Sequence, residues 1–291
     1  PYKKHPADFA LWKFKKPGEP SWPSPWGEGR PGWHIECSTM IYKHLGEQID
    51  IHGGGEDLIF PHHENEKAQS EARLGKPFVK YWMHVGLLSI KGEKMSKSLG
   101  NIFLIKDALK HVPFYAVRWY LLSVYYRRQL EFTEESLFRA YESVKNPIRA
   151  YWLLKQYVEE AEEKEAGAKA VERARELREE FHRYMCDDFN TPKAQAAIQE
   201  TSSLAMEVVN KDLGAEAAKE VYGVLLEELS VLGLVKDVDA KLVEFLKSIL
   251  EIRSLLRKKK EYEIADKIRA VLKALEVEVS DTKTRSYFVK Y

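Results

Sequence analysis

The sequence has few cysteines, no long apolar run and no excess of charge of either sign, and each absence excludes a class of protein. Its two cysteines permit at most one disulfide, which excludes a small secreted scaffold held together by disulfides. No apolar run approaches the ~18–20 residues that cross a bilayer, and no stretch has the pattern of a signal peptide. We therefore expect a soluble, cytoplasmic protein without a membrane partner.

Charge is nearly balanced over the 291 residues, with 46 Lys and Arg against 45 Asp and Glu. A chain coated with positive charge for nucleic acid is therefore excluded. The balance is uneven along the chain. Residues 241–291 carry 13 Lys and Arg against eight Asp and Glu, a net charge of +5, so the first 240 residues carry a net charge of −4. The apolar content of 44% is enough for a buried core, and the length suggests about two domains at ~150 residues each.

The pattern of secondary structure changes along the chain. Residues 1–32 hold seven of the twelve prolines and three of the seven tryptophans, which is typical of an ordered loop. The periodicity then predicts alternating helices and strands, an α/β arrangement, at 33–45, 49–52, 61–74 and 85–90. From about residue 108 it predicts long helices at 117–126, 135–157, 168–184 and 192–209, and a helical stretch at 237–275. Cys186 is predicted to be a buried small apolar residue.

Cys37, His62 and Glu66 form the first candidate site. His62 and Glu66 are four residues apart in a predicted helix, so they share one face of it. A thiolate, an imidazole and a carboxylate together suit Zn²⁺. Spacing alone leaves an alternative, in which His62 is a residue of the helix N-terminus, Glu66 is solvated and Cys37 is a small apolar residue of the core. It also does not choose between these residues and His63, Glu64 and Asn65 of the same turn.

A glycine-rich segment, Gly53-Gly54-Gly55, follows the predicted strand and precedes Asp57. Glycines let the backbone approach a ligand closely, and a carboxylate beyond them can accept hydrogen bonds from ribose hydroxyls. A tight structural turn is an equally good interpretation.

The second candidate site is the loop Lys94-Met95-Ser96-Lys97-Ser98-Leu99-Gly100-Asn101. Two ammonium groups three residues apart on a loop that ends in glycine can hold a triphosphate and stabilise the charge that develops on leaving pyrophosphate. An arbitrary pair of lysines at this spacing is usually solvated.

These motifs resemble those of class I aminoacyl-tRNA synthetases, and within them the cysteinyl-tRNA synthetases. The segment Lys94–Ser98 is identical to the second signature of the class. The other segments that carry the resemblance are 20–27, 29–38, 50–57, 60–66, 121–127, 187–194 and 265–282.

The resemblance implies an ATP-dependent enzyme that activates L-cysteine and transfers it to tRNA-Cys. It implies that Cys37, His62 and Glu66 bind Zn²⁺, which in this family binds the thiolate of substrate cysteine. Trp33 and His52 would line the cysteine pocket. The alternatives for these two are a core aromatic residue and a histidine at a strand end.

For the second substrate, the resemblance implies that Asp57 binds the adenosine ribose of ATP. Lys94 and Lys97 would bind its phosphates, with Mg²⁺, and act in catalysis.

The resemblance also implies three domains. Residues 1–110 would be the second half of a class I Rossmann-type catalytic domain, with the zinc site and the lysine loop. Residues 111–240 would be a helical bundle that binds the anticodon stem, and residues 241–291 a small basic module that binds tRNA. Tyr287 and Phe288 are candidates for stacking on its bases.

One signature of the class does not occur in the sequence. The motif His-x-Gly-His, which binds ATP, is absent, and so is the family's fourth zinc ligand, a cysteine from the same early half. We therefore expect a C-terminal portion that is inactive alone and needs the N-terminal half of the catalytic domain as a partner. Two alternatives are a non-catalytic tRNA-binding fragment and the related ligase that joins cysteine to glucosaminyl-inositol in mycothiol synthesis.

Overall fold

The computed structural model describes residues 3–90, 92–94, 102–236, 240–282 and 286–290. The chain folds as two compact units, which are described separately. Unit 1 comprises Pro1–Ser89 and Tyr126–Leu130, and unit 2 comprises Ile90–Tyr125 and Glu131–Tyr291. None of the described helices combines the length and apolar character that a membrane span requires.

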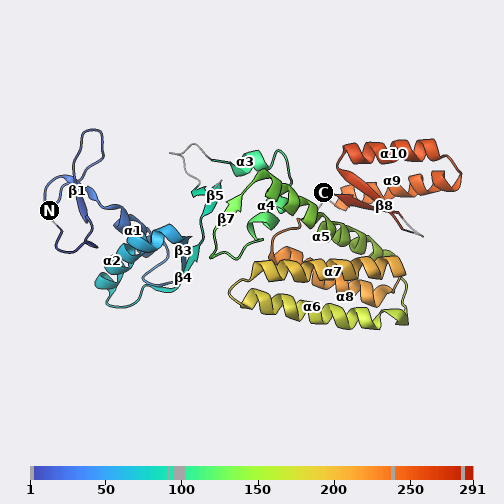
Figure 1. Cartoon of the computed structure of the whole chain (residues 1–291), viewed down its shortest axis with the longest axis horizontal. Helices are drawn as coiled ribbons and strands as arrows, with labels where there is room; N and C mark the ends of the chain where they lie inside the picture. The colour runs from blue at the N-terminus through green and yellow to red at the C-terminus, as the bar shows by residue number, and fades with distance from the viewer. Residues whose placement is uncertain (1–2, 91, 95–101, 237–239, 283–285, 291) are drawn as a thin grey trace. The chain divides into compact units, whose positions relative to one another are not determined.

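Unit 1 is a small α/β arrangement (Figure 1). Its helices and strands are β1 (Trp12–Phe14), β2 (Gly29–Pro31), α1 (Trp33–His44), β3 (Ile49–Gly55), α2 (Glu64–Leu74) and β4 (Val79–Val85). A 3-10 turn, Glu56–Leu58, and a π-helical turn, Ile59–His63, join β3 to α2. The strands β1 and β2 pair antiparallel, and β3 pairs parallel with β4.

The two faces of the β3–β4 pair differ. His52 of β3 lies opposite Trp82 of β4 in the register, and both contact His63, next to α2, so this face lies against the helical segment. Ile51 lies opposite Tyr81, one residue earlier on each strand, and both are exposed. Since side chains alternate between the faces of a strand, the second face of this parallel pair is uncovered.

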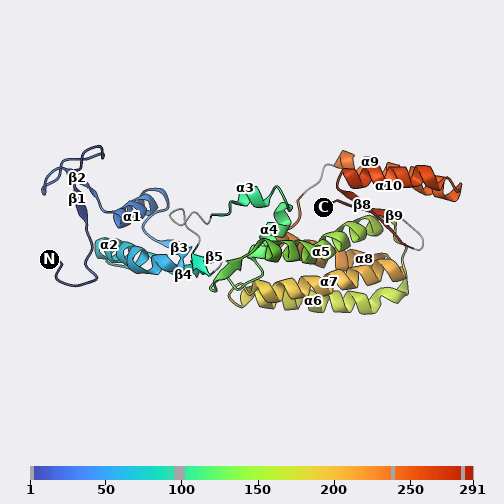
Figure 2. The same cartoon turned by 45° about the horizontal axis from the view of Figure 1, so that its top comes forward.

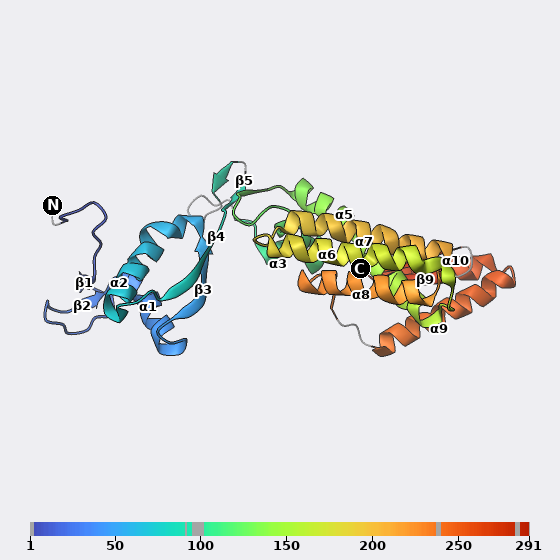
Figure 3. The same cartoon turned by 90° about the horizontal axis from the view of Figure 1, so that it is seen from below.

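Unit 2 is mainly helical. It contains α3 (Ile105–Ala108), α4 (Phe114–Leu121), α5 (Glu134–Glu160), α6 (Ala168–Cys186), α7 (Thr191–Lys211) and α8 (Ala215–Val231). Helices α5 to α8 run side by side as a bundle, as Figures 1 and 3 show. Thr133 begins α5 with a capping box, in which its hydroxyl accepts a hydrogen bond from the backbone N–H of Ser136 at 3.0 Å.

The last part of unit 2 is a helical hairpin on a β-hairpin (Figure 2). It contains α9 (Ala240–Lys258), α10 (Tyr262–Ala274), β8 (Val277–Asp281) and β9 (Ser286–Lys290). Arg253 of α9 is fully buried, and its two terminal nitrogens donate to the carboxylate of Asp281 at 2.9 and 3.1 Å. This forked ion pair attaches α9 to the β-hairpin.

Most of the predicted helices are present, but several predictions were wrong. The strand predicted at 85–90 is divided between β4 and β5 (Leu88–Ile90). Gly86 separates them, and a Cβ there would lie 2.2 Å from the carbonyl oxygen of Arg128. Strand β5 lies between β6 (Glu93–Lys94) and β7 (Leu130–Phe132) in a three-stranded sheet. Helix α8 was not predicted, whereas the stretch predicted to be helical at 237–275 does contain two helices, α9 and α10.

Two side-chain predictions also fail. Tyr287 and Phe288 are buried in β9, where the ring of Phe288 packs against Trp152 at 5.4 Å between ring centroids, so neither ring is presented for base stacking. Cys186 ends α6 and is exposed, because its position falls on the outer face of the bundle. The predicted domain boundaries at 110 and 240 stay predictions.

Candidate metal centre

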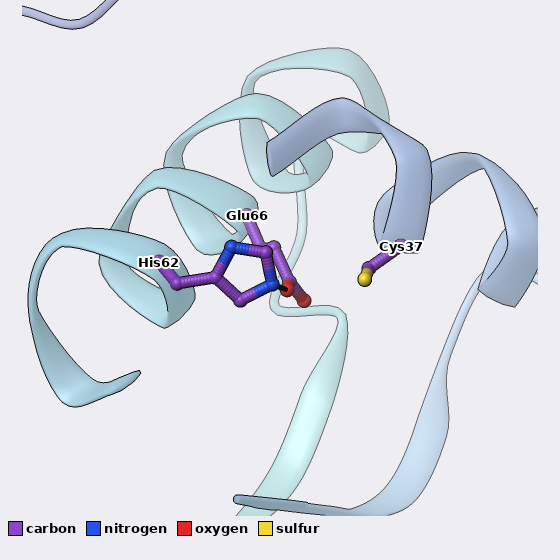
Figure 4. Close-up of side chains that lie close together, drawn as sticks. All are labelled: Cys37, His62 and Glu66. Carbon is purple, nitrogen blue, oxygen red and sulfur yellow. Dashed lines mark ion pairs between the residues drawn. The ribbon is translucent and has the colours of Figure 1, made fainter. Parts of the chain in front are cut away.

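The three predicted metal ligands come together in unit 1. Cys37 lies on α1, His62 lies on the π-helical turn before α2, and Glu66 lies one turn further along, in α2. Figure 4 shows the three side chains pointing toward one another. Their ligand atoms, one per residue, all lie within 4.8 Å of one another. The sequence spacing placed only His62 and Glu66 on one face, and the packing of α1 on α2 adds Cys37.

Glu66 is the unusual member of this group because its carboxylate is completely buried. Among the described residues, neither carboxylate oxygen makes a well-formed hydrogen bond, although the thiol of Cys37 lies close enough to interact with the carboxylate. His62 contacts one oxygen at ion-pair distance, and Nε2 of His52 lies 3.5 Å from the other. Burial raises the pKa of Glu66 to about 7 and lowers the pKa of both histidines, so neutral imidazoles do not compensate the carboxylate charge.

A bound cation would supply the positive charge that compensates the buried carboxylate of Glu66. A buried carboxylate without donors is costly, and it is normally paired or bound to a metal. A sulfur, a nitrogen and an oxygen ligand suit Zn²⁺, which takes four ligands in a tetrahedral arrangement. The three residues fit such an ion and leave one position for a further ligand.

A second group of possible ligands shares Glu66. His52, His63 and Glu66 also bring their ligand atoms within 4.8 Å of one another. Burial, together with the charges of His52 and His84, lowers the pKa of His63 to about 4. Nδ1 of His63 lies 2.8 Å from Nε2 of His84 on β4. His52 and His63 therefore line the site as neutral imidazoles, which can donate or accept a hydrogen bond.

His34 completes this group of histidines. Its Nδ1 lies 2.8 Å from Nδ1 of His62, which fixes the orientation of that ring. Sequence reasoning missed the roles of His34 and His84 and left that of His63 open. The only signals were the His62-His63 doublet and the alternation along β4, which places His84 on the same face as Trp82.

The two predicted substrate-binding residues flank the candidate ligands. Trp33 is 51% exposed, so it is not a core aromatic residue, and its ring stacks on His62 at 4.1 Å between centroids. His52 is half-buried and stacks on Trp82 at 4.8 Å. Both therefore border the same centre, one on its exposed side and one on the sheet.

The glycine segment belongs to β3, which continues through Gly55, and is not a turn. A Cβ on Gly54 would lie 2.6 Å from the ring of His63, and one on Gly55 would lie 2.5 Å from the carboxylate of Asp57. Glycine at these positions lets the strand approach the two side chains. Asp57 is exposed just after the strand.

The lysine loop is placed only in part. Lys94 ends β6, and its side chain is not described, while Lys97 lies outside the described residues. Their roles stay predictions.

Comparison with known proteins agrees with the motifs. The family model described as "tRNA synthetases class I (C) catalytic domain" matches residues 1–142, and the model described as "DALR domain" matches residues 180–236. The chain is 46% identical to the cysteine–tRNA ligase of Thermosipho melanesiensis and 43% identical to that of Thermococcus onnurineus. Each match covers 96% of this chain, but only 60% and 61% of the relatives' own lengths.

Solved structures agree on the fold. A leucyl-tRNA synthetase from Agrobacterium radiobacter K84, solved as a ternary complex with tRNA and LeuAMS, superposes with a TM-score of 0.54 at 16% identity. The superposition covers 73% of this chain and 34% of that one. The predicted fold class, a class I catalytic domain followed by a helical bundle, is thus confirmed. Over nearly its whole length this chain is similar to cysteine–tRNA ligases, of which it spans about three fifths, and its first 142 residues match the class I catalytic-domain model.

Proposed function

We propose that this chain provides the zinc-dependent cysteine pocket, the lysine loop and the tRNA-binding helices of a cysteine–tRNA ligase. The reaction would be ATP-dependent activation of L-cysteine to cysteinyl-adenylate, followed by transfer to tRNA-Cys. The observation that carries the proposal is the completely buried carboxylate of Glu66, which lies beside Cys37 and His62 and makes no well-formed hydrogen bond among the described residues.

Cys37, His62 and Glu66 would hold the zinc ion in this proposal. When bound, Zn²⁺ favours sulfur ligands and deprotonates a thiol, so it would select cysteine over serine. Such selection by ligation would explain how cysteine is chosen without an editing step.

The surrounding residues would orient the amino acid. Trp33, stacked over His62, would exclude water from the outer side of the pocket. His52 lies within 3.5 Å of Glu66 and would hold that carboxylate while the amino acid is bound. The second group of ligands, which shares Glu66, supports a pocket whose inner wall is lined by His52 of β3 and His63 of the π-helical turn.

The ATP-binding residues are proposed from the motifs. Asp57 would accept hydrogen bonds from the ribose, and its position against Gly55 at the end of β3 supports this. Lys94 and Lys97 would bind the phosphates of ATP with Mg²⁺ and stabilise the charge on pyrophosphate.

The uncovered face of β3–β4 supports the need for a further segment. Parallel sheets are normally covered on both faces, yet Tyr81 is 67% exposed and its partner in the register, Ile51, is also exposed. The relatives are longer than this chain by about two fifths of their own length. We propose that the N-terminal half of the catalytic domain, in the same polypeptide or as a separate one, covers this face.

The remaining proposed partner is tRNA-Cys. The bundle of α5 to α8 includes the residues that match the DALR domain, and residues 241–291 carry a net +5 charge. Lysine and arginine side chains of this module would bind phosphates of the anticodon arm, with an affinity that falls as salt rises.

A complementation assay tests the proposal. The 291-residue chain alone should give no ATP–pyrophosphate exchange with cysteine, and joining it to the upstream segment of the T. melanesiensis relative should give exchange and charging of tRNA-Cys. In the joined enzyme, Lys97→Ala should lower the rate about 100- to 1000-fold, the usual effect of removing one preorganised donor.

Two outcomes would contradict the proposal. Robust exchange by the chain alone would show that it needs no further segment. A joined protein that binds tRNA-Cys, contains zinc and forms no cysteinyl-adenylate would favour the non-catalytic tRNA-binding alternative.

A further inference from the structure

The helical hairpin at the end of the chain carries apolar residues that the fold does not bury. On α9, Phe245, Ile249, Ile252 and Leu256 follow the spacing i, i+4, i+7, i+11, which forms one stripe along a helix. Phe245 is 58% exposed and Ile252 is also exposed, while the other two are half-buried.

The neighbouring helix repeats this pattern. Ile264, Ile268 and Val271 of α10, with its C-cap Leu275, have the same spacing. Val271 is 61% exposed, and Ile264 and Leu275 are exposed as well. Figures 1 and 2 show α9 and α10 running side by side, so the hairpin carries two apolar stripes.

The stripes are distinct from the faces that hold the module together. Leu246, Leu250 and Arg253 are the buried residues of α9, and Ala265 and Leu272 are those of α10. Helix α9 packs on β9 and α10 on β8. The fold therefore uses one face of each helix and leaves the apolar stripe beside it in solvent. Exposed apolar patches of this kind mark interaction sites on soluble proteins.

The charge around the stripes is positive. Residues 240–276 contain ten Lys and Arg against six Asp and Glu, and four of the basic residues follow one another at the tip of the hairpin, Arg257–Lys260. A partner with an acidic face would be attracted, whereas a second copy of the same module would be repelled.

We propose that the α9 and α10 stripes, Phe245 to Leu256 and Ile264 to Leu275, form a docking site for an acidic amphipathic helix of a partner protein. Stripes with the spacing i, i+4, i+7 accept the apolar face of a third helix. All but one of their residues are aliphatic, whereas unpaired bases stack on aromatic rings or arginine planes, so these stripes are not suited to RNA. The site adds a protein partner to the proposed tRNA ligase and does not depend on that activity.

A peptide titration tests the docking site on the full 291-residue chain. The probe is a fluorescently labelled helical peptide with leucines at the first and fourth positions of each heptad and glutamates on the opposite face, followed by anisotropy. Val271→Lys should weaken binding about tenfold or more, since it removes apolar area and adds a charge within the contact. The matched control is Val231→Lys on α8, because Val231 is 53% exposed and lies outside the hairpin.

The remaining measurements separate the occupants. A peptide of the same length with lysines in place of the glutamates should bind at least tenfold more weakly; equal binding of the two peptides would overturn the acidic partner. Sedimentation should show a monomer. A dimer that Val271→Lys dissociates would assign the stripes to a second copy, and a loss of tRNA binding in Val271→Lys, with no effect on the peptide, would assign them to RNA. Either result would overturn the proposal.

Discussion

The indole ring of Trp33 stacks on the imidazole of His62, with 4.1 Å between the ring centroids and 27° between the planes. Trp33 is the first residue of α1 and its side chain is half-exposed, while His62 is buried and contacts Glu66. One face of the candidate metal centre is therefore covered by an aromatic side chain that a bound amino acid would meet first.

Replacing this ring should affect the substrate more than the fold. In the joined enzyme, Trp33→Ala should raise KM for cysteine about tenfold, the value of one aromatic contact, and leave the zinc content unchanged. Its melting temperature should change little, because Trp33 is half-exposed. Trp33→Phe should restore most of the KM, and Trp22→Ala, an exposed tryptophan of the N-terminal loop, should not alter it. An unchanged KM in Trp33→Ala would exclude the pocket role.

Zinc binding can be tested on the chain itself. The three ligands should hold one zinc ion per chain that a mild chelator removes, because three protein ligands leave a position that water would fill. Cys37→Ser should lower the affinity about tenfold to a hundredfold, since it replaces the preferred sulfur ligand. The control is Cys186→Ser, which removes the other cysteine, an exposed one. One tightly held zinc per chain, resistant to chelation, would contradict the three-ligand site.

Local periodicity in the sequence was enough to place His62 and Glu66 on one face. His62 and Glu66 share a face because α2 is helical, and the predicted helix at 33–45 corresponds to α1. The histidines His34 and His84 could not be predicted, since they reach the site through the packing of α1 on α2 and the register of β3 with β4. Such contacts depend on tertiary structure, which no local pattern encodes.

The failures at the C-terminal end have a similar cause. Tyr287 and Phe288 are near basic residues in the sequence, which favoured a base-stacking role. They are buried because β9 packs on α5 and α9, and Gln156 of α5 binds the backbone of Phe288 at 2.8 and 3.2 Å. A short strand such as β9 gives a weak sequence signal, so the burial of its side chains was not evident from the sequence.

Glu228 gives a prediction for the stability of the bundle. It is almost completely buried on α8, where the hydroxyl of Thr201 donates to one of its oxygens at 3.1 Å. Burial raises its pKa from 4.5 to about 8. The folded chain therefore keeps this proton up to about pH 8, whereas the unfolded chain releases it near pH 4.5, so Glu228 lowers the free energy of unfolding as pH rises between these values.

Glu228→Gln should remove this pH dependence. The variant should match the parent near pH 4.5 and melt several degrees higher at pH 8.5, since each unit of difference in pKa between the folded and unfolded chain corresponds to about 1.4 kcal/mol. The control is Glu227→Gln, whose carboxylate pairs with Arg178 and His182 near the surface. The measurement is the difference in melting temperature between each variant and the parent, taken from melting curves at several pH values. A constant difference across the range would show that Glu228 is ionised in the folded chain.

The exposed side chain of Tyr81 tests where the N-terminal half would bind. Tyr81→Glu places a charge on the uncovered face of β3–β4, next to Ile51 in the register, and should leave the zinc content and the melting temperature of the chain unchanged because the residue is exposed. The upstream segment of a relative, added as a separate polypeptide, should then restore tRNA charging to the parent chain. With Tyr81→Glu the rate of charging should be at least tenfold lower, since a charge buried without a partner is costly. Lys80→Glu, which changes the preceding residue of the same strand, should complement as the parent does. Equal complementation by Tyr81→Glu and the parent would mean that the segment covers another surface.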